Sequence, residues 1–351
     1  MQGKLVEENK VKCLVWDLDN TLWDGTLLEG DDVELKQNNI HIIKTLDSRG
    51  ILQSIASKND YTKAMEKLHD LGLENYFLYP QISWNSKSHS IKRIADSFNI
   101  GIDSIAFIDD QPFEREEVKF THPDVLCIDE NNRDCLLDMP EMNPRFITED
   151  SKIRRLMYLS DIERNKQETE FVGPTEEFLA SLGMKLTISE AKEDDLQRAE
   201  ELTVRTHQLN TTGYTYSYDE LNFFRCSKEH LLLVASLIDR YGTYGKIGLV
   251  LVECSIECWN IKLLLMSCRV MSRGVGGVLI THLRNQAKNA GVRLQSEMIS
   301  NDRNRMMYMT YKFSNFVEKK KKGDLVIFEN DLTNIPGFPE YMKVATEHCS
   351  E

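Results

Sequence analysis

The sequence lacks the features of a membrane protein, of a disulfide-stabilised secreted protein and of a general nucleic-acid-binding protein. No apolar run approaches the roughly 18 residues that a membrane-spanning helix needs, and the first ten residues, MQGKLVEENK, contain no apolar signal core. The eight cysteines are scattered, without a CxxC pair or a Cys/His cluster at zinc spacing, so we expect reduced thiols. The formal net charge of −13 disfavours unaided binding to nucleic acid or to an anionic membrane. We therefore expect a cytoplasmic protein with neither of these partners.

The composition is that of a globular protein with about two domains. The chain has 351 residues, of which 41% are hydrophobic and 28% charged, and ordinary domains have roughly 150 residues. Changes of pattern along the chain predict a first domain over residues 1–134, a helical connector over residues 135–183 and a second domain over residues 184–351.

The first domain is predicted to be α/β, with a doubly wound parallel sheet. Between residues 11 and 130, short apolar runs such as VKCLVW, ILQSIAS and SIAFIDD alternate with longer helical segments such as YTKAMEKLHDLGL. Strands that are buried on both faces read as continuous apolar runs, and strand–helix alternation implies parallel crossovers. The connector loses this pattern and is charged and helix-prone.

The second domain is predicted to be α/β with a mainly antiparallel sheet. Its order is a strand, a helix, several consecutive strands, a helix over residues 276–291 and two further strands. Tight turns that contain glycine, such as RYGTYG, join consecutive strands as antiparallel hairpins. The lysine run at 319–322 precedes Gly323 and Asp324, so we expect it in a solvated hairpin turn.

The stretch KCLVWDLDNTLWDG places Asp17 and Asp19 one residue apart, directly after an apolar run. Two carboxylates this close raise each other's pKa, and burial adds a desolvation cost. A cation or a phosphoryl group between them would offset both costs. Asn20 and Thr21 follow directly and add polar groups to the same strand end.

Other polar residues are predicted to converge on this point, because ligands bind beyond the carboxyl ends of the strands in an open parallel sheet. The run ILQSIA ends at Ser57, SIAFI ends at Asp109 and Asp110, and Lys87 opens a helix between them. This set suits phosphoryl transfer, with an acid as nucleophile, Mg²⁺ on hard oxygen ligands, and a hydroxyl and an ammonium to hold phosphoryl oxygens.

These segments resemble the four motifs of the haloacid dehalogenase (HAD) phosphatase superfamily: DLDNTLW, IASKND, Lys87 and FIDDQPFERE. The resemblance implies that Asp17 is the phosphoryl-accepting nucleophile, Asp19 the acid/base, and Lys87 and Ser57 the groups that hold the phosphate. It implies an Mg²⁺ site. The implied metal ligands are Asp17, Asp19, Asp109 and Asp110, and the implied substrate-binding residues are Ser57, Asn20, Thr21 and Lys58.

The short segments from Thr21 to Ser57 and from Ser57 to Lys87 leave no room for a cap domain at either usual insertion point. We therefore expect an open site, which can admit a substrate carried on another protein.

A longer resemblance narrows the family. WDLDNTLWDG, FIDDQPFERE, LTVRTHQLNTTG and LMSCRVMSRGVGG resemble, in this order, the FkbH-like proteins of polyketide biosynthesis. The match covers residues from about 11 to about 330. It implies a glyceryltransferase/phosphatase that takes 1,3-bisphosphoglycerate or a similar phosphorylated three-carbon acid, loses its phosphates, and delivers a glyceryl thioester to an acyl carrier protein. Some relatives are associated with lactate-derived units.

The stretch RVMSRGVGGVLITHL runs from a strand through small residues into a helix, whose first N–H groups can bind a phosphate of pantetheine or coenzyme A. It resembles the pyrophosphate loop of the GNAT N-acetyltransferase fold. Arg269 and Gly274 match that pattern and are predicted substrate-binding residues, whereas Ser272 stands where the first glycine is expected.

Cys268 immediately precedes this loop, and Arg269 beside it would favour the thiolate. Such a thiol can accept an acyl group and pass it to the thiol of a carrier's phosphopantetheine arm, with His207 as its base. Cys268 can equally be a small buried hydrophobe. Many FkbH-like proteins carry cysteine between the two aspartates, where this chain has Leu18. The chain would then use another thiol, transfer directly to the carrier, or lack transferase activity.

Two other functions stay open. The first is a HAD phosphatase acting on a small or carrier-bound phosphate without acyl transfer. The second is a non-catalytic module that docks a carrier. Carrier proteins are usually acidic, so docking on a chain of net charge −13 needs a local basic patch. The candidate segments are IKRIAD, KIRR and KKKK.

Overall fold

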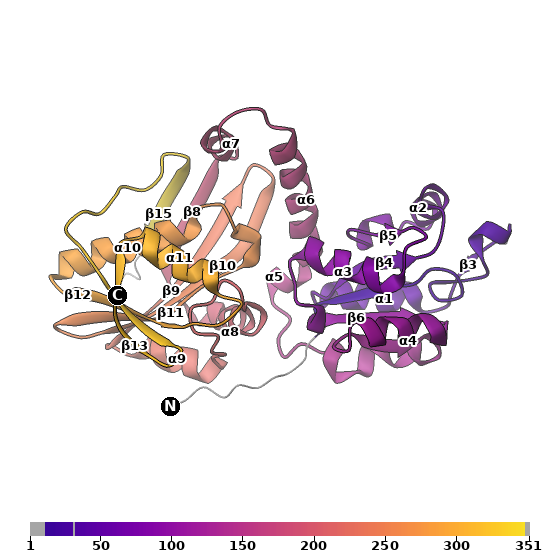
Figure 1. The fold of residues 1–351 in the computed structure, drawn as a ribbon, viewed down its shortest axis with the longest axis horizontal. Helices are drawn as coiled ribbons and strands as arrows, with labels where there is room; N and C mark the ends of the chain where they lie inside the picture. The colour runs from indigo at the N-terminus through magenta and orange to yellow at the C-terminus, as the bar shows by residue number, and fades with distance from the viewer. Residues whose placement is uncertain (1–10, 31, 348–351) are drawn as a thin grey trace. The chain divides into compact units, whose positions relative to one another are not determined.

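The computed structural model describes residues 11–30 and 32–347 (Figure 1). The expectation for the first ten residues lies outside this part of the chain. The chain divides into two compact units between Leu159 and Ser160, and this boundary falls inside helix α6 (Arg154–Glu170). None of the helices within residues 11–30 and 32–347 has the length and apolarity to cross a membrane.

The first unit contains a five-stranded sheet in the order β5-β4-β1-β6-β7. All of its strand pairs are parallel, as predicted. An antiparallel pair, β2 and β3, follows β1 and forms a separate small hairpin. The strands are β1 (Cys13–Trp16), β2 (Trp23–Asp24), β3 (Glu34–Leu35), β4 (Leu52–Ser57), β5 (Gln81–Ile82), β6 (Ile105–Asp109) and β7 (Leu126–Asp129).

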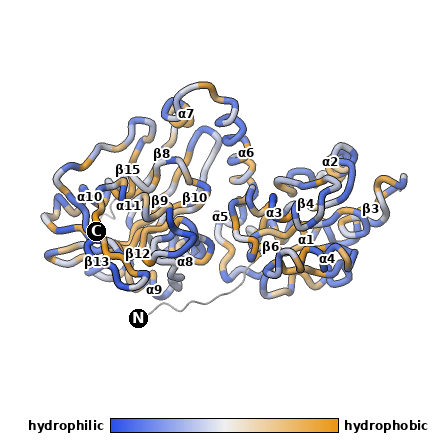
Figure 2. Tube along the Cα trace, viewed as in Figure 1, coloured by the Kyte–Doolittle hydropathy of each residue, from blue (hydrophilic) through white to orange (hydrophobic). Residues whose placement is uncertain are grey.

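Helices cover both faces of this sheet. Ile42 and Leu46 of α1 join Leu14 and Ile108 of the sheet in one buried cluster, whereas α3 and α4 contact each other and strands β4 and β6. The helices are α1 (Asn39–Ser48), α2 (Tyr61–Asp70), α3 (Lys87–Phe98), α4 (Pro112–Thr121) and α5 (Glu149–Lys152), with 3-10 turns at η1 (Leu27–Glu29), η2 (Glu74–Tyr76), η3 (Ile102–Ser104), η4 (Glu130–Asp138) and η5 (Pro140–Met142). The strands are the most hydrophobic part of the unit (Figure 2). The predicted doubly wound α/β fold is confirmed.

The register of the strands brings the predicted site residues to one edge. Trp16, the last residue of β1, pairs with Ile55 of β4 and with Ile108 of β6. Because all three strands run in the same direction, Asp17, Ser57 and Asp109 follow at the same carboxyl edge.

The second unit contains an eight-stranded sheet in the order β13-β14-β12-β11-β10-β9-β8-β15. Only the pairs β11–β12 and β15–β8 are parallel, so the sheet is mainly antiparallel, as predicted. The strands are β8 (Met184–Glu190), β9 (His230–Asp239), β10 (Gly242–Cys254), β11 (Cys258–Met266), β12 (Arg293–Ile299), β13 (Phe316–Lys322), β14 (Leu325–Asn330) and β15 (Met342–Glu347).

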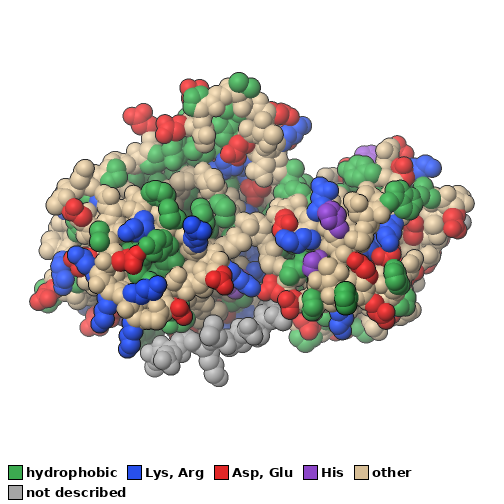
Figure 3. All heavy atoms as spheres, in the orientation of Figure 1, with side chains coloured by type: hydrophobic (Ala, Val, Ile, Leu, Met, Phe, Trp, Pro, Cys, Tyr) green, Lys and Arg blue, Asp and Glu red, His purple; other side chains and the backbone are tan. Residues whose placement is uncertain are grey.

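Helices again lie on both faces. Leu196 of α8 and Leu221 of α9 pack with Leu263 on one face, and Phe178 of α7 and Leu279 of α10 belong to the cluster of the other. The helices are α7 (Thr175–Ser181), α8 (Leu196–Arg205), α9 (Tyr218–Cys226), α10 (Val275–Ala290) and α11 (Arg305–Phe313), with 3-10 turns at η6 (Glu193–Asp195) and η7 (Cys268–Val270). On the face drawn in Figure 3, hydrophobic side chains also gather at the surface over α11.

A segment outside the regular strands fills the gap between β11 and β12. These strands pair only from Cys258 to Ile261 of β11. Beyond that, Met266 N donates to Leu209 O at 2.8 Å, and Ile299 N of β12 donates to Thr211 O at 2.9 Å. The segment Leu209–Thr212 therefore satisfies backbone groups of both strands where they diverge.

The lysine run does not lie in the hairpin turn. Lys320, Lys321 and Lys322 pair with β14, and only Gly323 and Asp324 form the turn. β13 is an edge strand whose residues after Phe316 are exposed, and a row of lysines there keeps the edge solvated and opposes pairing with another chain.

Candidate functional site

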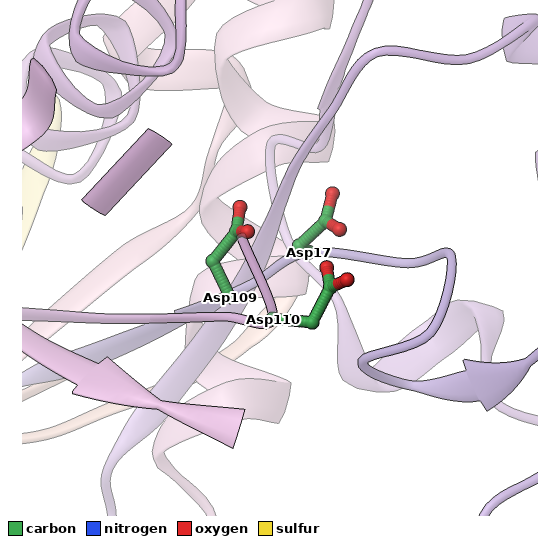
Figure 4. A group of neighbouring side chains, drawn as sticks. All are labelled: Asp17, Asp109 and Asp110. Atoms are coloured by element: carbon green, nitrogen blue, oxygen red, sulfur yellow. The ribbon is translucent and has the colours of Figure 1, made fainter. Parts of the chain in front are cut away.

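Three carboxylates converge at the carboxyl edge of the first sheet. One oxygen from each of Asp17, Asp109 and Asp110 lies within 4.8 Å of the others, and Figure 4 shows the side chains projecting to the same side of the strand ends. Asp17 follows β1, and its backbone N–H donates to Ile108 O at 3.0 Å, which fixes it against β6. Asp17 and Asp109 are only 6% and 1% exposed, so their charges are poorly solvated.

Lys87 places a positive charge beside two of these carboxylates. Its Nζ donates to Asp17 Oδ1, and to Asp109 Oδ2 at 3.0 Å. Lys87 is 3% exposed and opens α3, whose N-cap Ser86 accepts a hydrogen bond from His89 N. Burial lowers the pKa of Lys87, but attraction by Asp17 and Asp109 outweighs this and raises it, so the ammonium form is held.

One lysine does not balance three acids. Burial and then repulsion from Asp17 raise the pKa of Asp109 to about 6, and the same two causes raise the pKa of Asp110. This excess of negative charge is the arrangement that a divalent cation would relieve. Asp17, Asp109 and Asp110 supply hard oxygen donors of the type that Mg²⁺ prefers, so the residues present fit an Mg²⁺ site.

The Asp19 carboxylate is not among the three that converge, and its role as a metal ligand stays a prediction. Its Oδ1 accepts hydrogen bonds from Trp23 Nε1 at 2.8 Å and Leu27 N at 3.2 Å, and its Oδ2 accepts one from Asn59 Nδ2 at 2.9 Å. N–H donors thus occupy both oxygens. Burial raises the pKa of Asp19 more than these hydrogen bonds lower it, which favours the protonated form that a general acid needs.

Thr21 and Asn20 organise the loop after β1. The Thr21 hydroxyl accepts a hydrogen bond from Asp110 N at 3.0 Å and donates to Asp110 Oδ1 at 3.4 Å. Asn20 adopts a positive φ of 55°, its side-chain oxygen accepts from Gly25 N, and its carbonyl accepts from Lys36 Nζ. Both residues hold the loop that carries Asp17 and Asp19.

Ser57 and Lys58 differ in placement. Ser57 ends β4 and is 4% exposed, at the same edge as Asp17. Lys58 Nζ instead pairs with Glu114 Oε1 of α4 at 2.6 Å. A substrate contact by Lys58 would compete with this ion pair.

Sequence reasoning missed the residues that hold Asp19 in place. Trp23 lies inside the quoted motif DLDNTLW, so its four-residue spacing from Asp19 was available as a signal. Asn59 is 40 residues away in sequence and is buried, and no local pattern connects it with Asp19.

The loop before α10 contains two residues with positive φ. Gly274 is the N-cap of α10, with φ 78°, and a Cβ at this position would overlap the Tyr341 hydroxyl. Ser272 adopts φ 66°, a left-handed conformation that glycine reaches without cost. Arg269 Nη2 donates to Tyr244 O at 2.7 Å, so this predicted ligand-binding guanidinium is directed at β10.

Cys268 lies beside the segment that fills the strand gap. Its thiol donates a hydrogen bond to Gln208 Oε1, with 3.9 Å between the sulfur and oxygen atoms. Gln208 adjoins the predicted base His207, which is exposed. The structure thus brings the thiol to Gln208, a residue that sequence reasoning missed.

Residues 14–85 match the family model described as haloacid dehalogenase-like hydrolase. No curated protein matches the chain. Among solved structures, the chain is similar to the N-terminal part of a Bacteroides fragilis protein that contains a phosphatase domain and is complexed with Mg. The identity is 30% and the TM-score 0.31, over 36% of this chain and 39% of that one.

Two further similar structures are acetyltransferases. The ribosomal-protein-S18-alanine N-acetyltransferase of Escherichia coli is 16% identical, with a TM-score of 0.34, over 41% of this chain and 92% of that one. The PaiA N-acetyltransferase of Thermoplasma acidophilum, in complex with coenzyme A, is 15% identical, with a TM-score of 0.34, over 41% of this chain and 98% of that one. The residues that match the haloacid dehalogenase-like hydrolase model lie in the first unit, which also contains the carboxylate–lysine site.

Proposed function

We propose that the first unit catalyses Mg²⁺-dependent phosphoryl transfer with Asp17 as the nucleophile. The observation that carries this proposal is the convergence of Asp17, Asp109 and Asp110 within 4.8 Å, with the buried Lys87 paired to two of them. Asp17, Asp109 and Asp110 would hold Mg²⁺, which supplies positive charge to the phosphoryl oxygens when it is bound.

The residues of the chain account for both halves of the reaction. A carboxylate oxygen of Asp17 attacks phosphorus, the bond from phosphorus to the leaving oxygen breaks, and Asp19 gives that oxygen a proton. Asp19 then takes a proton from water, whose oxygen attacks the aspartyl phosphate and releases inorganic phosphate. Lys87 and Ser57 hold the phosphoryl oxygens while the charge redistributes.

The finer proposal is that the donor is 1,3-bisphosphoglycerate or a related phosphorylated three-carbon acid and that the acceptor is an acyl carrier protein of polyketide biosynthesis. Its support is the resemblance of four separate sequence blocks to the FkbH-like family. Loading the carrier forms a bond between its thiol sulfur and the acyl carbon, breaks the bond from that carbon to the phosphate oxygen, and passes the thiol proton to a base.

The second unit would receive the phosphopantetheine arm at the loop before α10. In this proposal Gly274 and the first N–H groups of the helix bind the phosphate, and Cys268 relays the acyl group with His207 as base. The hydrogen bond from Cys268 to Gln208 places a polar side chain beside the reacting sulfur.

Intact-mass analysis of a carrier protein tests the proposal. The carrier is incubated with the enzyme, Mg²⁺ and 1,3-bisphosphoglycerate, and a mass gain that matches glyceryl is expected. Asp17→Asn should abolish hydrolysis of a phosphate monoester, and unchanged hydrolysis would mean that Asp17 is not the nucleophile. Normal loading by Cys268→Ala would eliminate this thiol as the acyl acceptor.

The alternative is a phosphatase that acts on a small or carrier-bound phosphate without acyl transfer. Leu18 favours it, because this position between the two aspartates offers no thiol and is fully buried. Free phosphate without a mass gain on the carrier would support this alternative. If neither free phosphate nor acylated carrier forms, the result would support a non-catalytic docking module.

A further inference from the structure

We infer that the exposed face of α11 and the edge strand β13 form a docking surface for a partner protein, and that the partner presents an acidic helix with an apolar stripe. The inference rests on the proposed function, in which an acidic carrier protein brings its phosphopantetheine arm to the second unit. It deepens that function by assigning the surface on which the carrier lies.

One side of α11 is apolar and exposed. Met306, Met309 and Phe313 follow one another at spacings of three and four residues, so their side chains lie on the same side of the helix. Met306 is 52% exposed and Phe313 81%, whereas Met307 and Tyr311 on the opposite side are fully buried. Large apolar side chains grouped at a surface mark a contact with another molecule. We call this group the α11 stripe.

The surface beside the α11 stripe is basic, although the chain as a whole is acidic. Between residues 303 and 322 there are seven Lys or Arg residues and one acidic residue, which is a local charge of +6 in a chain of net charge −13. Arg305 and Lys312 are exposed and lie four and three residues from Met309, so they line one edge of the stripe. Figure 3 shows basic side chains beside the hydrophobic ones over α11. Positive charge along an apolar stripe complements an acidic amphipathic helix.

Strand β13 extends this basic edge. The Tyr308 hydroxyl of α11 donates a hydrogen bond to Glu318 Oε1 of β13, which ties the helix to the strand. Lys321 pairs with Val326 of β14, and Val326 packs in the same buried cluster as Met307 of α11. Because directly paired residues project to the same face of a sheet, Lys321 adds its charge on the face that α11 covers. The lysines oppose pairing of another strand with this edge but attract acidic side chains.

The structure distinguishes the three basic segments that the sequence offers for docking. Lys92 of IKRIAD pairs with Asp96, and Arg155 of KIRR pairs with Asp47 at 3.0 Å. The lysines at 319–322 are exposed on β13, and β13 contacts α11. The lysine run is therefore favoured, because its charges face solvent and the α11 stripe adds apolar contact area.

The α11 stripe adjoins the loop at which the phosphopantetheine arm is proposed to bind. Gly276 lies in the first turn of α10, and a Cβ at this position would lie 3.1 Å from Cγ2 of Thr310. Thr310 follows Met309 directly and lies four residues after Met306, at the other edge of the stripe. A carrier that is seated on the stripe therefore has its arm beside the N-terminus of α10.

The composition of the surface favours a protein over a nucleic acid. Nucleic acids bind mainly through their phosphates, which reward a basic chain and gain little from exposed methionine. Methionine side chains are flexible and polarisable, and they adapt to the apolar face of a partner helix. The α11 stripe supplies two methionines and a phenylalanine, in a chain whose net charge of −13 repels nucleic acid elsewhere.

A binding titration tests the inference. A fluorescently labelled holo acyl carrier protein is titrated with each protein while its anisotropy is followed. The proteins are the parent, Phe313→Ala, the double variant Arg305→Glu with Lys312→Glu, and the controls Phe223→Ala and Lys228→Glu. Both control residues are exposed and lie on or just after α9, which packs on the other face of the sheet.

We expect Kd to rise about tenfold in Phe313→Ala and in the double charge reversal. The effect of the charge reversal should shrink as NaCl is added, because salt screens exposed charges, whereas the effect of Phe313→Ala should persist. Both controls should bind like the parent. No binding of the carrier to the parent, or the same Kd in all five proteins, would overturn the inference.

Two further measurements test other occupants of the surface. If a labelled oligouridine binds more tightly than the carrier, and only the charge reversal weakens it, the surface belongs to nucleic acid and the inference fails. Sedimentation velocity tests a second copy of the chain. A dimer of the parent that Phe313→Ala dissociates would mean that another copy covers the α11 stripe, which would also overturn the inference.

The docking surface and the proposed reaction can fail separately. Phe313→Ala should hydrolyse p-nitrophenyl phosphate at the parent rate, since Phe313 lies in the second unit and Asp17 in the first, but it should load a carrier present below its Kd about tenfold more slowly. If the parent loads no acyl group while Phe313→Ala still weakens carrier binding, the proposed transfer fails and the surface stands. Equal loading by the parent and Phe313→Ala under these conditions would overturn the surface and leave the proposed transfer intact.

Discussion

The side-chain amide of Asn59 donates a hydrogen bond to Oδ2 of Asp19 at 2.9 Å and so links the loops that follow β4 and β1. The other oxygen of Asp19 is held by Trp23 and Leu27 of the segment after β1. The proposed acid/base is therefore held by hydrogen bonds to both of its oxygens, and it is not among the three carboxylates that converge. In the proposed mechanism, these different surroundings would let two aspartates that are one residue apart perform different chemistry.

Asn59→Ala should lower the rate of reactions that need a proton on the leaving oxygen. Without its partner the Asp19 carboxyl is free to rotate, and a positioned general acid contributes about 10² to 10⁴ in rate. We expect kcat for an alkyl phosphate to fall about tenfold or more and kcat for acetyl phosphate, whose leaving group is a stable carboxylate, to change less. The exposed control Asn75→Ala should match the parent. Equal losses on both substrates would argue against a role through Asp19.

Lys87→Met should destabilise the first unit as well as inactivate it. The change leaves Asp17 and Asp109 buried without their counter-charge, and removing one partner of a buried ion pair costs about 3 kcal/mol or more. The free energy of unfolding from urea titrations measures this loss.

The matched control is Lys92→Met on the same helix. Lys92 pairs with Asp96 at the surface, where such pairs contribute about 0 to 1 kcal/mol. Similar losses for the two variants would mean that the buried cluster does not depend on Lys87.

The convergence of the polar residues at the carboxyl edge of the first sheet was predictable because it follows from the topology of the sheet. Apolar runs ending at Trp16, Ser57 and Asp109 imply parallel strands, and parallel strands deliver their last residues to one edge. The roles of Asn59, and of Glu114 as the partner of Lys58, were not predictable. Each depends on contacts between segments 40 and 56 residues apart that no periodic pattern encodes.

The loop before α10 shows a different limit of prediction from sequence. The small residues predicted a loop between a strand and a helix, but they did not predict the positive φ that Ser272 and Gly274 adopt in it. The insertion of Leu209–Thr212 between two strands depends on where β11 and β12 separate. Neither strand's sequence marks that point.

The stability of the metal-free protein should depend on the ionisation of Asp109. Its pKa is about 6 in the folded protein against a usual value of 3.8, so the folded state favours the protonated form. The contribution of this group to stability is fully present below about pH 3.8 and is lost as the pH rises through about 6.

Added Mg²⁺ should reverse this loss, because it requires ionised carboxylates. The rise in melting temperature caused by Mg²⁺ should be larger at pH 7.5 than at pH 5, and Asp109→Asn should reduce the difference. The same rise at both pH values in the parent protein would contradict a site that contains Asp109.

Asn304 should be a main determinant of the stability of the second unit. It is fully buried, and its amide donates to Ile299 O at 2.8 Å and to Asn210 O at 3.2 Å. Asn304→Ala leaves these buried carbonyls without a donor, which costs about 2 kcal/mol. Asn285→Ala, on the exposed side of α10, is the control, and chemical denaturation of the two variants measures the difference. A loss no larger than that of the control would mean that the segment Leu209–Thr212 is held by its backbone alone.

Gly274→Ala should destabilise the second unit for two separable reasons. The φ of 78° costs an L-residue about 1 kcal/mol, and the new Cβ would overlap the Tyr341 hydroxyl. Tyr341→Phe removes the hydroxyl but leaves the φ unchanged. In a double-mutant cycle followed by chemical denaturation, Gly274→Ala should therefore cost less in the Tyr341→Phe background than in the parent, with a remaining cost of about 1 kcal/mol. Equal costs in both backgrounds would mean that the chain around Tyr341 moves aside freely and that Gly274 is required for its backbone conformation alone.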